Sequence, residues 1–198
     1  MKKKKIFILL GHPDTETSVG SFADEYERGA KEADHEVHRI NISDLNFDPI
    51  LHKGYKEIQE LEPDLKRVQE EMKWADHYVF LYPNWWCTMP AVLKGMFDRM
   101  FLPGFAFNYR KNKKGGNTIF WDKLLSGKSA RIVVTTGSHP LLIRIFFGDY
   151  TNELSRGILG FAGVSPVRVS VFGPCGDTPP KKKEGWKKKM YSLGRKGI

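Results

Sequence analysis

The sequence predicts an α/β protein built on a five-stranded parallel sheet with helices on both faces. Three observations lead to this fold class: five short strand-like segments are present, segments of helical periodicity separate them, and no repeat or low-complexity linker divides the chain. Strands separated by helices are joined by crossover connections and pair in parallel. Five such strands predict the doubly wound order 2-1-3-4-5. The 198 residues fit a single domain, residues 1–198.

Five short segments are strand-like, and the first of them is a continuous apolar run, as expected for a strand that helices cover on both faces. They occupy residues 5–10, 37–42, 78–82, 131–136 and 167–172. Gly11, Pro83 and Gly137 follow three of these runs directly and end them. Ligands of doubly wound sheets bind beyond the carboxyl ends of the strands, so the loops that begin at these residues are the candidate binding loops.

Amphipathic segments fill the gaps between the strands. Phe22, Tyr26, Ala30 and Ala33 recur at helical spacing and predict a helix over residues 21–33. Two more helices are expected to begin after Pro63 and at Pro90, since the first helical turn tolerates proline. Helices are also predicted over residues 149–161 and 184–193, whereas residues 45–55 and 105–126 are expected to be irregular.

The positive charge of the chain is concentrated at its two ends. Lys and Arg number 32 against 23 Asp and Glu, for a net charge of +9. Residues 2–5 and 181–198 hold 12 of the basic residues and one acidic residue, so the body of the protein is close to neutral. Nucleic acid is therefore not expected as a partner. The ends are interpreted as solubilising, with attraction of anionic ligands as the alternative.

Cysteine content and hydropathy indicate a cytoplasmic protein. The two cysteines, Cys87 and Cys175, suit a reducing compartment and exclude a disulfide scaffold or a cysteine-based zinc site. No run of about 18 uncharged apolar residues predicts a membrane-spanning helix. The apolar run at residues 6–10 is too short for a secretory signal.

The first candidate loop, residues 11–21, carries hydroxyl groups into the start of a helix. Hydroxyls and free N–H groups at that place favour a phosphate. The loop has neither the Walker pattern nor GxGxxG, so a Rossmann dinucleotide site is not indicated. The alternative is simple capping of the helix by Ser18 or Ser21.

The second candidate loop, residues 82–90, contains adjacent tryptophans between two prolines. Trp85 and Trp86 cannot both face a core from a tight loop, so they are predicted to line a flat slot for a planar ligand. The alternative is that they pack under the following helix. Cys87 beside them has no partner cysteine and is interpreted as a packing residue.

The third candidate loop, residues 135–140, combines hydroxyls with glycine. Gly137 permits close approach of the backbone to a ligand, and the neighbouring N–H groups suit the carbonyl edges of a ring. His139 is either a proton donor or simply solvated. Four basic residues after the aromatic stretch 104–109 either form a solvated loop or attract the 2′-phosphate of NADPH. These are Arg110, Lys111, Lys113 and Lys114.

Residues 83–101, PNWWCTMPAVLKGMFDRMF, closely resemble the central signature of the flavodoxin-like NAD(P)H:quinone oxidoreductases. That family includes DT-diaphorase, the modulator of drug activity B and the ancillary flavoprotein of potassium-efflux systems. Weaker matches at residues 46–50, 104–109, 135–137 and 184–188 extend the likeness over nearly the whole chain.

The resemblance implies a homodimer with a flavin at each interface. The flavin phosphate region would be held by His12, Ser18, Val19, Gly20 and Ser21. The isoalloxazine ring would be flanked by Pro83, Asn84, Trp85, Trp86 and Cys87. Its pyrimidine edge would meet Thr135, Thr136, Gly137 and Ser138. The substrate slot would be closed from the partner subunit by Ala106, Phe107, Asn108 and Tyr109.

The implied reaction is a two-electron, ping-pong reduction of a quinone or nitroaromatic acceptor by NAD(P)H. Trp86, Gly137 and His139 are the candidate catalytic residues, for ring stacking, backbone hydrogen bonding and proton donation. No metal is expected. FMN is favoured over FAD, because the longer C-terminal region of the mammalian members is missing here. Ile143 and Phe147 stand where those members have a tyrosine and a histidine, so their proton relay is not expected.

Three other functions compete with this one. The first is a regulatory flavoprotein subunit of a membrane ion-efflux system, with the basic ends on the transporter or on anionic lipid as a peripheral contact. The second is a flavodoxin-type electron carrier, against which the near-neutral body argues because such carriers use an acidic docking surface. The third is a polyanion binder that uses the basic ends.

Overall fold

A computed structural model describes residues 2–113 and 115–198, and its centre is the expected parallel sheet. The sheet has five strands in the order β2-β1-β3-β6-β7. All four neighbouring pairs are parallel. The strands are β1 (Lys5–Leu10), β2 (Glu36–Asn41), β3 (His77–Pro83), β6 (Ser129–Thr135) and β7 (Val167–Phe172). When only the strands of this sheet are numbered, the order is the predicted 2-1-3-4-5.

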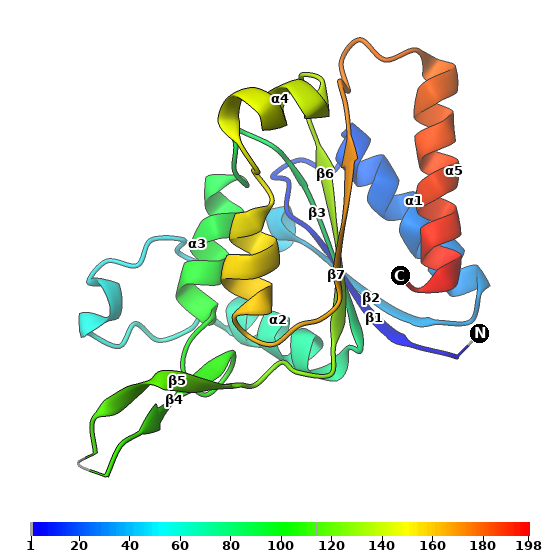
Figure 1. The fold of residues 1–198 in the computed structure, drawn as a ribbon. Helices are drawn as coiled ribbons and strands as arrows, with labels where there is room; N and C mark the ends of the chain where they lie inside the picture. Colours follow the sequence, from blue (N-terminus) through cyan, green and yellow to red (C-terminus); the bar gives the residue numbers. More distant parts are fainter. Residues whose placement is uncertain (1, 114) are drawn as a thin grey trace.

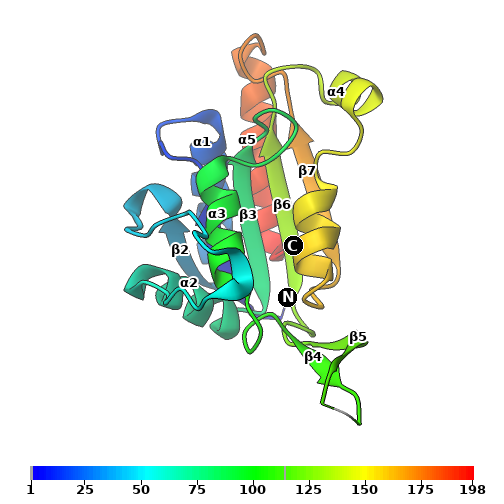
Figure 2. The same cartoon turned by 90° about the vertical axis from the view of Figure 1, so that its left-hand side faces the viewer.

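Helices cover both faces of the sheet, as Figures 1 and 2 show. One face carries α1 (Ser18–Glu32) and α5 (Pro180–Lys196). The other carries α2 (Pro63–Trp74), α3 (Ala91–Met100) and the π-helix η3 (Glu153–Gly160). In the described part of the chain, no helix combines the length and the apolar character needed to cross a membrane.

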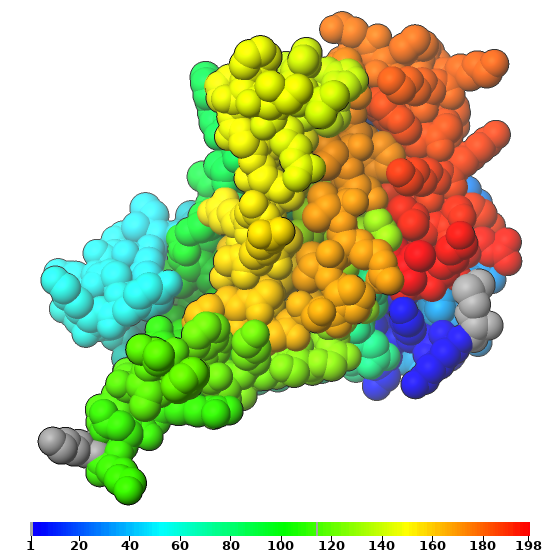
Figure 3. All heavy atoms as spheres, viewed as in Figure 1, coloured from blue at the N-terminus to red at the C-terminus, as the bar shows by residue number. Residues whose placement is uncertain are grey.

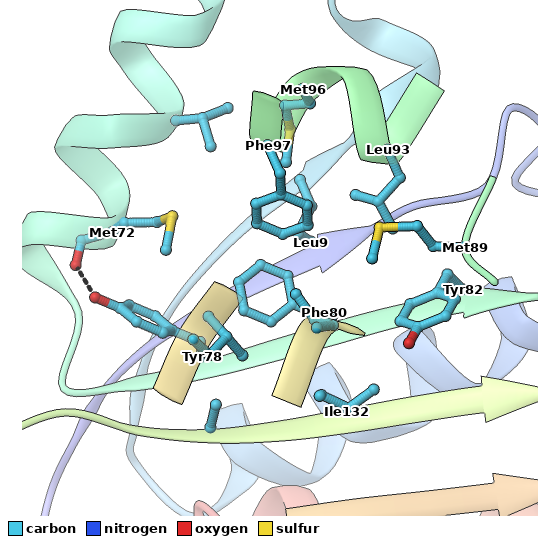
Figure 4. Packing of buried hydrophobic residues seen from close by; sticks show 14 of the residues in the cluster. Leu9, Met72, Tyr78, Phe80, Tyr82, Met89, Leu93, Met96, Phe97 and Ile132 are labelled. Carbon is cyan, nitrogen blue, oxygen red and sulfur yellow. Dashed lines mark hydrogen bonds between the residues drawn. The ribbon is translucent and has the colours of Figure 1, made fainter. Parts of the chain in front are cut away.

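Alternate residues of the strands supply two separate apolar cores. Ile6, Ile8 and Leu10 of β1 pack with α1 and α5, whereas Phe7 and Leu9 pack with α2 and α3. This alternation follows from the two-residue period of a strand whose faces are both covered. Figure 4 shows the second core, where the Tyr78 hydroxyl donates to the carbonyl oxygen of Met72 at 2.6 Å.

Two glycines let α1 and α5 cross in close contact. A Cβ on Gly29 would lie 2.2 Å from the carbonyl oxygen of Tyr191, and one on Gly194 would lie 2.0 Å from that of Tyr26. The same packing brings the two basic ends together, because Lys4 Nζ donates to the carbonyl oxygen of Gly197 at 2.7 Å. The predicted C-terminal helix, residues 184–193, is shorter at both ends than the observed helix α5.

The segment expected to be irregular, residues 105–126, forms an antiparallel hairpin. Its strands are β4 (Phe107–Lys111) and β5 (Asn117–Lys123). The hairpin stands away from the sheet, at the lower left of Figure 3. Trp121 anchors it: the indole stacks on Phe161 at 4.5 Å between ring centres and donates to the carbonyl oxygen of that residue at 3.0 Å. The prediction missed these strands because their side chains are mostly exposed.

The stretch after β6 also differs from the prediction. A helix, α4 (Pro140–Phe147), was not predicted. The helix predicted over residues 149–161 is shorter in the structure and is limited to η3. The helix α4 ends at Gly148, whose φ of +82° turns the chain away. At the other end of the chain, α1 begins at Ser18 rather than residue 21, because the Thr17 side chain caps it.

Buried Arg99 of α3 holds the segment between β2 and α2 against the body. The segment contains two short 3-10 turns, η1 (Ile42–Asp44) and η2 (Gly54–Lys56). The Arg99 guanidinium donates to the carbonyl oxygens of Asp48 and Glu60 and pairs with the Glu62 carboxylate at 3.0 Å. These contacts fix a long connection that has little regular structure of its own.

Candidate functional site

A cavity of about 630 Å³ opens beyond the carboxyl ends of β3 and β6. Two predicted loops and one helix that was not predicted meet there. Its lining residues are Asn84, Trp86, Cys87, Gly137, Ser138, Ile143 and Phe147. The loops are tied together, because the Asn84 N–H donates to the Thr135 carbonyl oxygen at 2.7 Å. We call this cavity the slot, and its volume is typical of sites for small organic ligands.

A strained tight turn carries the tryptophans to the edge of the slot. The backbones of Trp85 and Thr88 bond each other at 3.0 and 3.1 Å, with Trp86 and Cys87 between them at φ +52° and +63°. This is the conformation of a type I′ turn, which normally takes Asn and Gly. A side chain in the left-handed region costs about 1–2 kcal/mol, and such strain persists mainly at functional sites. Trp86 is 99% exposed, so the indole is not part of the core.

The carboxylate of Glu153 stabilises this turn through a hydrogen bond. The Thr88 hydroxyl donates to the Glu153 carboxylate, from the first turn of the π-helix η3. Burial raises the pKa of Tyr82, and the charges of Glu153 and Asp149 raise it further. Burial likewise raises the pKa of Tyr150, whose neighbours include Asp149 and Cys87. Both phenols therefore keep their protons and remain hydrogen-bond donors near the turn.

The third loop lines the slot with Gly137 and Ser138, and not with its two threonines. Thr135 and Thr136 are buried, and the Thr136 hydroxyl is used inside the loop, where it donates to the Ser138 carbonyl oxygen at 2.7 Å. A Cβ on Gly137 would have no other atom within 4 Å, so this position faces open space. His139 is exposed, precedes α4 and is absent from the slot lining.

In the first loop, Thr17 caps α1, rather than Ser18 or Ser21 as the capping alternative proposed. Its hydroxyl accepts the Gly20 N–H at 3.1 Å. A Cβ on Gly20 would lie 1.9 Å from the Thr15 carbonyl oxygen, so the loop closes this tightly only with glycine. Val19 and Gly20 are buried, whereas Ser18 and Ser21 are half-buried. His12 packs edge-on against Trp85, with ring centres 5.4 Å apart, and so joins this loop to the second one.

The predicted substrate-closing residues lie at the other end of the sheet from the slot of their own chain. They belong to or adjoin β4 of the hairpin, whose second strand, β5, leads into the start of β6, whereas the slot follows the end of β6. The seven residues of β6 span about 20 Å. Ala106 is buried, Phe107 is half-buried, and Asn108 and Tyr109 are exposed. Of the predicted basic residues nearby, Lys114 lies outside the described part of the chain.

The polar groups around the slot fit the edge of a flavin. The Asn84 side-chain oxygen is buried and has no hydrogen-bond partner among residues 2–113 and 115–198. In the described part of the chain, the N–H groups of Cys87, Gly137 and Ser138 also form no hydrogen bond. A flavin pyrimidine ring offers both acceptor carbonyls and a donor N–H, which match this set. No cluster of His, Cys, Asp and Glu able to hold a metal ion occurs among the described residues.

The sequence predicted the loops that line the slot but not helix α4, which also lines it. Ile143 and Phe147 were noticed only as departures from a family pattern, yet both line the slot from α4. Pro140 followed by a dense apolar stretch was the available signal for that helix. No sequence pattern links Thr88 to Glu153, since 65 residues separate them.

Comparison with known proteins finds relatives and a solved structure that match most of the chain. NAD(P)H dehydrogenase (quinone) 1 of Rattus norvegicus is 25% identical over 223 residues, which cover 98% of this chain and 78% of the rat protein. The FMN-dependent NADH:quinone oxidoreductase of Macrococcus caseolyticus is 28% identical over 203 residues, which cover 91% and 92%. The crystal structure of Smu.1420 from Streptococcus mutans superimposes with a TM-score of 0.79 at 26% identity, covering 96% of this chain and 98% of that one.

A family model described as a flavodoxin-like fold matches residues 4–192. The match includes all five strands of the sheet and all the loops that form the slot. The resemblance found in the sequence is thereby confirmed, and the chain belongs to the flavodoxin-like family, as a relative of proteins named NAD(P)H:quinone oxidoreductases.

Proposed function

We propose that this protein is a flavin-dependent oxidoreductase that takes electrons from NAD(P)H and reduces quinones or similar aromatic acceptors. The observation that carries the proposal is the slot itself. It brings an exposed indole, an unpartnered buried amide oxygen and three free N–H groups to one opening at the end of the sheet. The names of the relatives, which are oxidoreductases acting with NADH or NAD(P)H, support the same class of enzyme.

The chain supplies binding, orientation and fixed hydrogen bonds, and the flavin supplies the redox chemistry, as hydride acceptor from NAD(P)H and two-electron donor to the quinone. Trp86 offers a flat surface at the mouth, and Ile143 with Phe147 excludes water from the opposite wall. The N–H groups of Gly137 and Ser138 stabilise negative charge at the pyrimidine edge. Donor and acceptor use the same slot in turn, which makes the reaction ping-pong.

FMN is the cofactor best supported. The Macrococcus caseolyticus relative, which matches 91% of this chain, is named as FMN-dependent. FAD remains the alternative, since its adenosine half would need a further site. Release of the cofactor and measurement of its mass distinguish the two directly.

A second copy of the chain would complete the slot. Within one chain, Asn108 and Tyr109 are too far from the slot to reach it, although both are exposed. Large apolar side chains also lie uncovered around the slot and on the Arg99-held segment, an unusual density for a monomer. Five of them are Trp86, Ile145, Phe146, Tyr55 and Ile58, each at least 65% exposed. A homodimer would cover them and bring the β4 residues of one chain to the slot of the other.

The first experiment is an absorption spectrum of the purified protein, followed by NAD(P)H oxidation with a quinone as acceptor. Flavin absorbance, and turnover that is lost in Trp86→Ala, is the expected result. A colourless protein that gains no flavin on reconstitution refutes the proposal.

Subunit mixing tests the shared slot. Trp86→Ala damages the slot of its own chain, and Tyr109→Ala damages the segment offered to the partner. Random mixing of the two inactive variants should restore about a quarter of the sites, because half of the dimers are mixed and each has one intact slot. No recovery on mixing contradicts the shared slot but leaves the cofactor assignment standing.

A further inference from the structure

A second cavity, of about 290 Å³, lies between the N-terminal parts of α1 and α5. Helix α1 and its cap contribute three hydroxyl side chains, and α5 contributes two lysines and an indole. These residues are Thr17, Ser18, Ser21, Lys183, Lys187 and Trp186. We call this cavity the basic groove. It joins residues more than 160 positions apart in sequence, so no local pattern indicated it.

The two lysines of the basic groove differ from the other lysines of α5. Lys183 and Lys187 are half-buried, whereas Lys181, Lys182 and Lys188 are exposed. Lys183 Nζ has one weak contact, to the Gly176 carbonyl oxygen at 3.5 Å, and so keeps most of its donor capacity. Lys187 Nζ pairs with Glu184 at 3.0 Å, but that carboxylate is 60% exposed and competes only modestly. The two lysines outnumber Glu184, which also lines the basic groove, so the groove carries net positive charge. The Ser21 hydroxyl already donates to the Ser18 carbonyl oxygen at 2.8 Å, which leaves the hydroxyls of Thr17 and Ser18 as donors for a ligand.

The other cavity beside α1 has the opposite character. It is larger, about 660 Å³, and is lined by Glu16, Asp24 and Arg39 among others. Arg39 is already paired with Asp24 at 2.6 Å and with Glu27 at 3.2 Å. A phosphate placed there would meet carboxylates in excess of cations. Of these two cavities beside α1, the basic groove is the one suited to a phosphate.

We propose that Lys183 and Lys187 bind the phosphate of the flavin in the basic groove, an inference that rests on the proposed function. One loop connects the two sites: His12 contacts Trp85 beside the slot, and Thr17, five residues later, lines the basic groove. A ligand with a flat ring and an anionic tail would follow this loop. Lysine ammonium groups bind phosphate through charge-assisted hydrogen bonds, and the hydroxyls of Thr17 and Ser18 supply further donors. The positive charge of α5 thus has a function beyond solubility.

The test compares FMN with riboflavin, which has the same ring but no phosphate. Dissociation constants are measured on the apoprotein through quenching of flavin fluorescence. In Lys183→Met and Lys187→Met, FMN binding should weaken about tenfold each, the effect of losing one partly screened charge-assisted contact. Riboflavin binding should stay unchanged, and Lys183→Arg should retain most of the FMN affinity. Lys188→Met removes the same charge from the exposed side of α5 and should bind FMN like the wild type.

Several outcomes overturn the proposal. FMN binding that is unchanged in both variants, or weakened equally in Lys188→Met, shows that the basic groove does not hold the phosphate. An equal loss of FMN and riboflavin shows a structural defect, which thermal unfolding of the variants would reveal independently. A wild-type protein that binds neither flavin removes the proposed function together with this inference. A wild type that binds FMN, with variants that bind it equally well, removes this inference alone.

Discussion

His77, at the start of β3, predicts a specific loss of stability in acid. The side chain is fully buried, and its Nδ1 lies 2.8 Å from the Ser129 hydroxyl. Its Nε2 has no hydrogen-bond partner among the described residues. Burial is the main cause that lowers the pKa of His77 from 6.5 to about 3, and the charges of Lys4 and Arg131 add to it. The folded protein therefore keeps this imidazole neutral well below pH 6.5.

The direction of the pH effect on stability depends on whether the folded or the unfolded state binds the proton. Between pH 6.5 and about 3, the unfolded chain protonates His77 and the folded protein does not. Because the unfolded state binds more protons there, the free energy of unfolding falls as the pH is lowered through this window. The difference between the two pKa values lowers the free energy of unfolding by about 4 kcal/mol at pH 3 and about 3 kcal/mol at pH 4. Above pH 6.5 the effect vanishes.

The assay is urea unfolding of the wild type and His77→Gln from pH 7 to pH 4. Gln keeps a hydrogen bond to Ser129 but takes up no proton in this range. The wild type should lose about 3 kcal/mol more than the variant over that span. Other titrating groups are common to both proteins and cancel in the comparison. Parallel pH profiles would refute the assignment of His77 as a buried neutral group.

Three further predictions concern the loops. Gly137→Leu should weaken flavin binding at least tenfold with an unchanged Tm, since the added side chain enters open space at the slot; equal affinity contradicts this. Gly20→Ala should lower the free energy of unfolding by about 1–3 kcal/mol, because its Cβ would collide with the Thr15 carbonyl oxygen, and unaltered urea unfolding would disprove the collision. Glu153→Ala should weaken flavin binding about fivefold, because it removes the hydrogen bond from Thr88. Thr88→Val should weaken flavin binding by the same factor, and Glu153→Gln should bind flavin almost as the wild type does. Unchanged flavin affinity in Thr88→Val would show that this hydrogen bond does not hold the turn.

The sheet was predictable because its signals are local. The strands are short apolar or alternating segments, and Gly11, Pro83 and Gly137 follow three of the predicted ones and mark the candidate loops. The order of the strands then follows from general topology rather than from any residue. The position of Trp86 at the slot was predictable for a similar reason, since two adjacent tryptophans in a tight loop cannot both face the core; Trp85, predicted to line the slot too, is not among its lining residues.

The hairpin, α4 and the basic groove required tertiary information. β4 and β5 are held by a contact between Trp121 and Phe161, which no short-range pattern encodes. The apolar side chains of α4 point mostly to solvent, so a search for a buried face does not find the helix. Lys183 and Thr17 become neighbours only because α5 packs against α1. In each case the deciding interaction joins segments far apart in the chain.

The placement of the β4–β5 hairpin has a consequence for handling the protein. If each slot borrows its cover from another chain, the competent enzyme exists only above the concentration at which pairs form. Specific activity would then decline on dilution while every chain stays folded, and adding protein back would restore it. Stocks stored at different concentrations would disagree in apparent turnover for a reason that lies in topology rather than in damage.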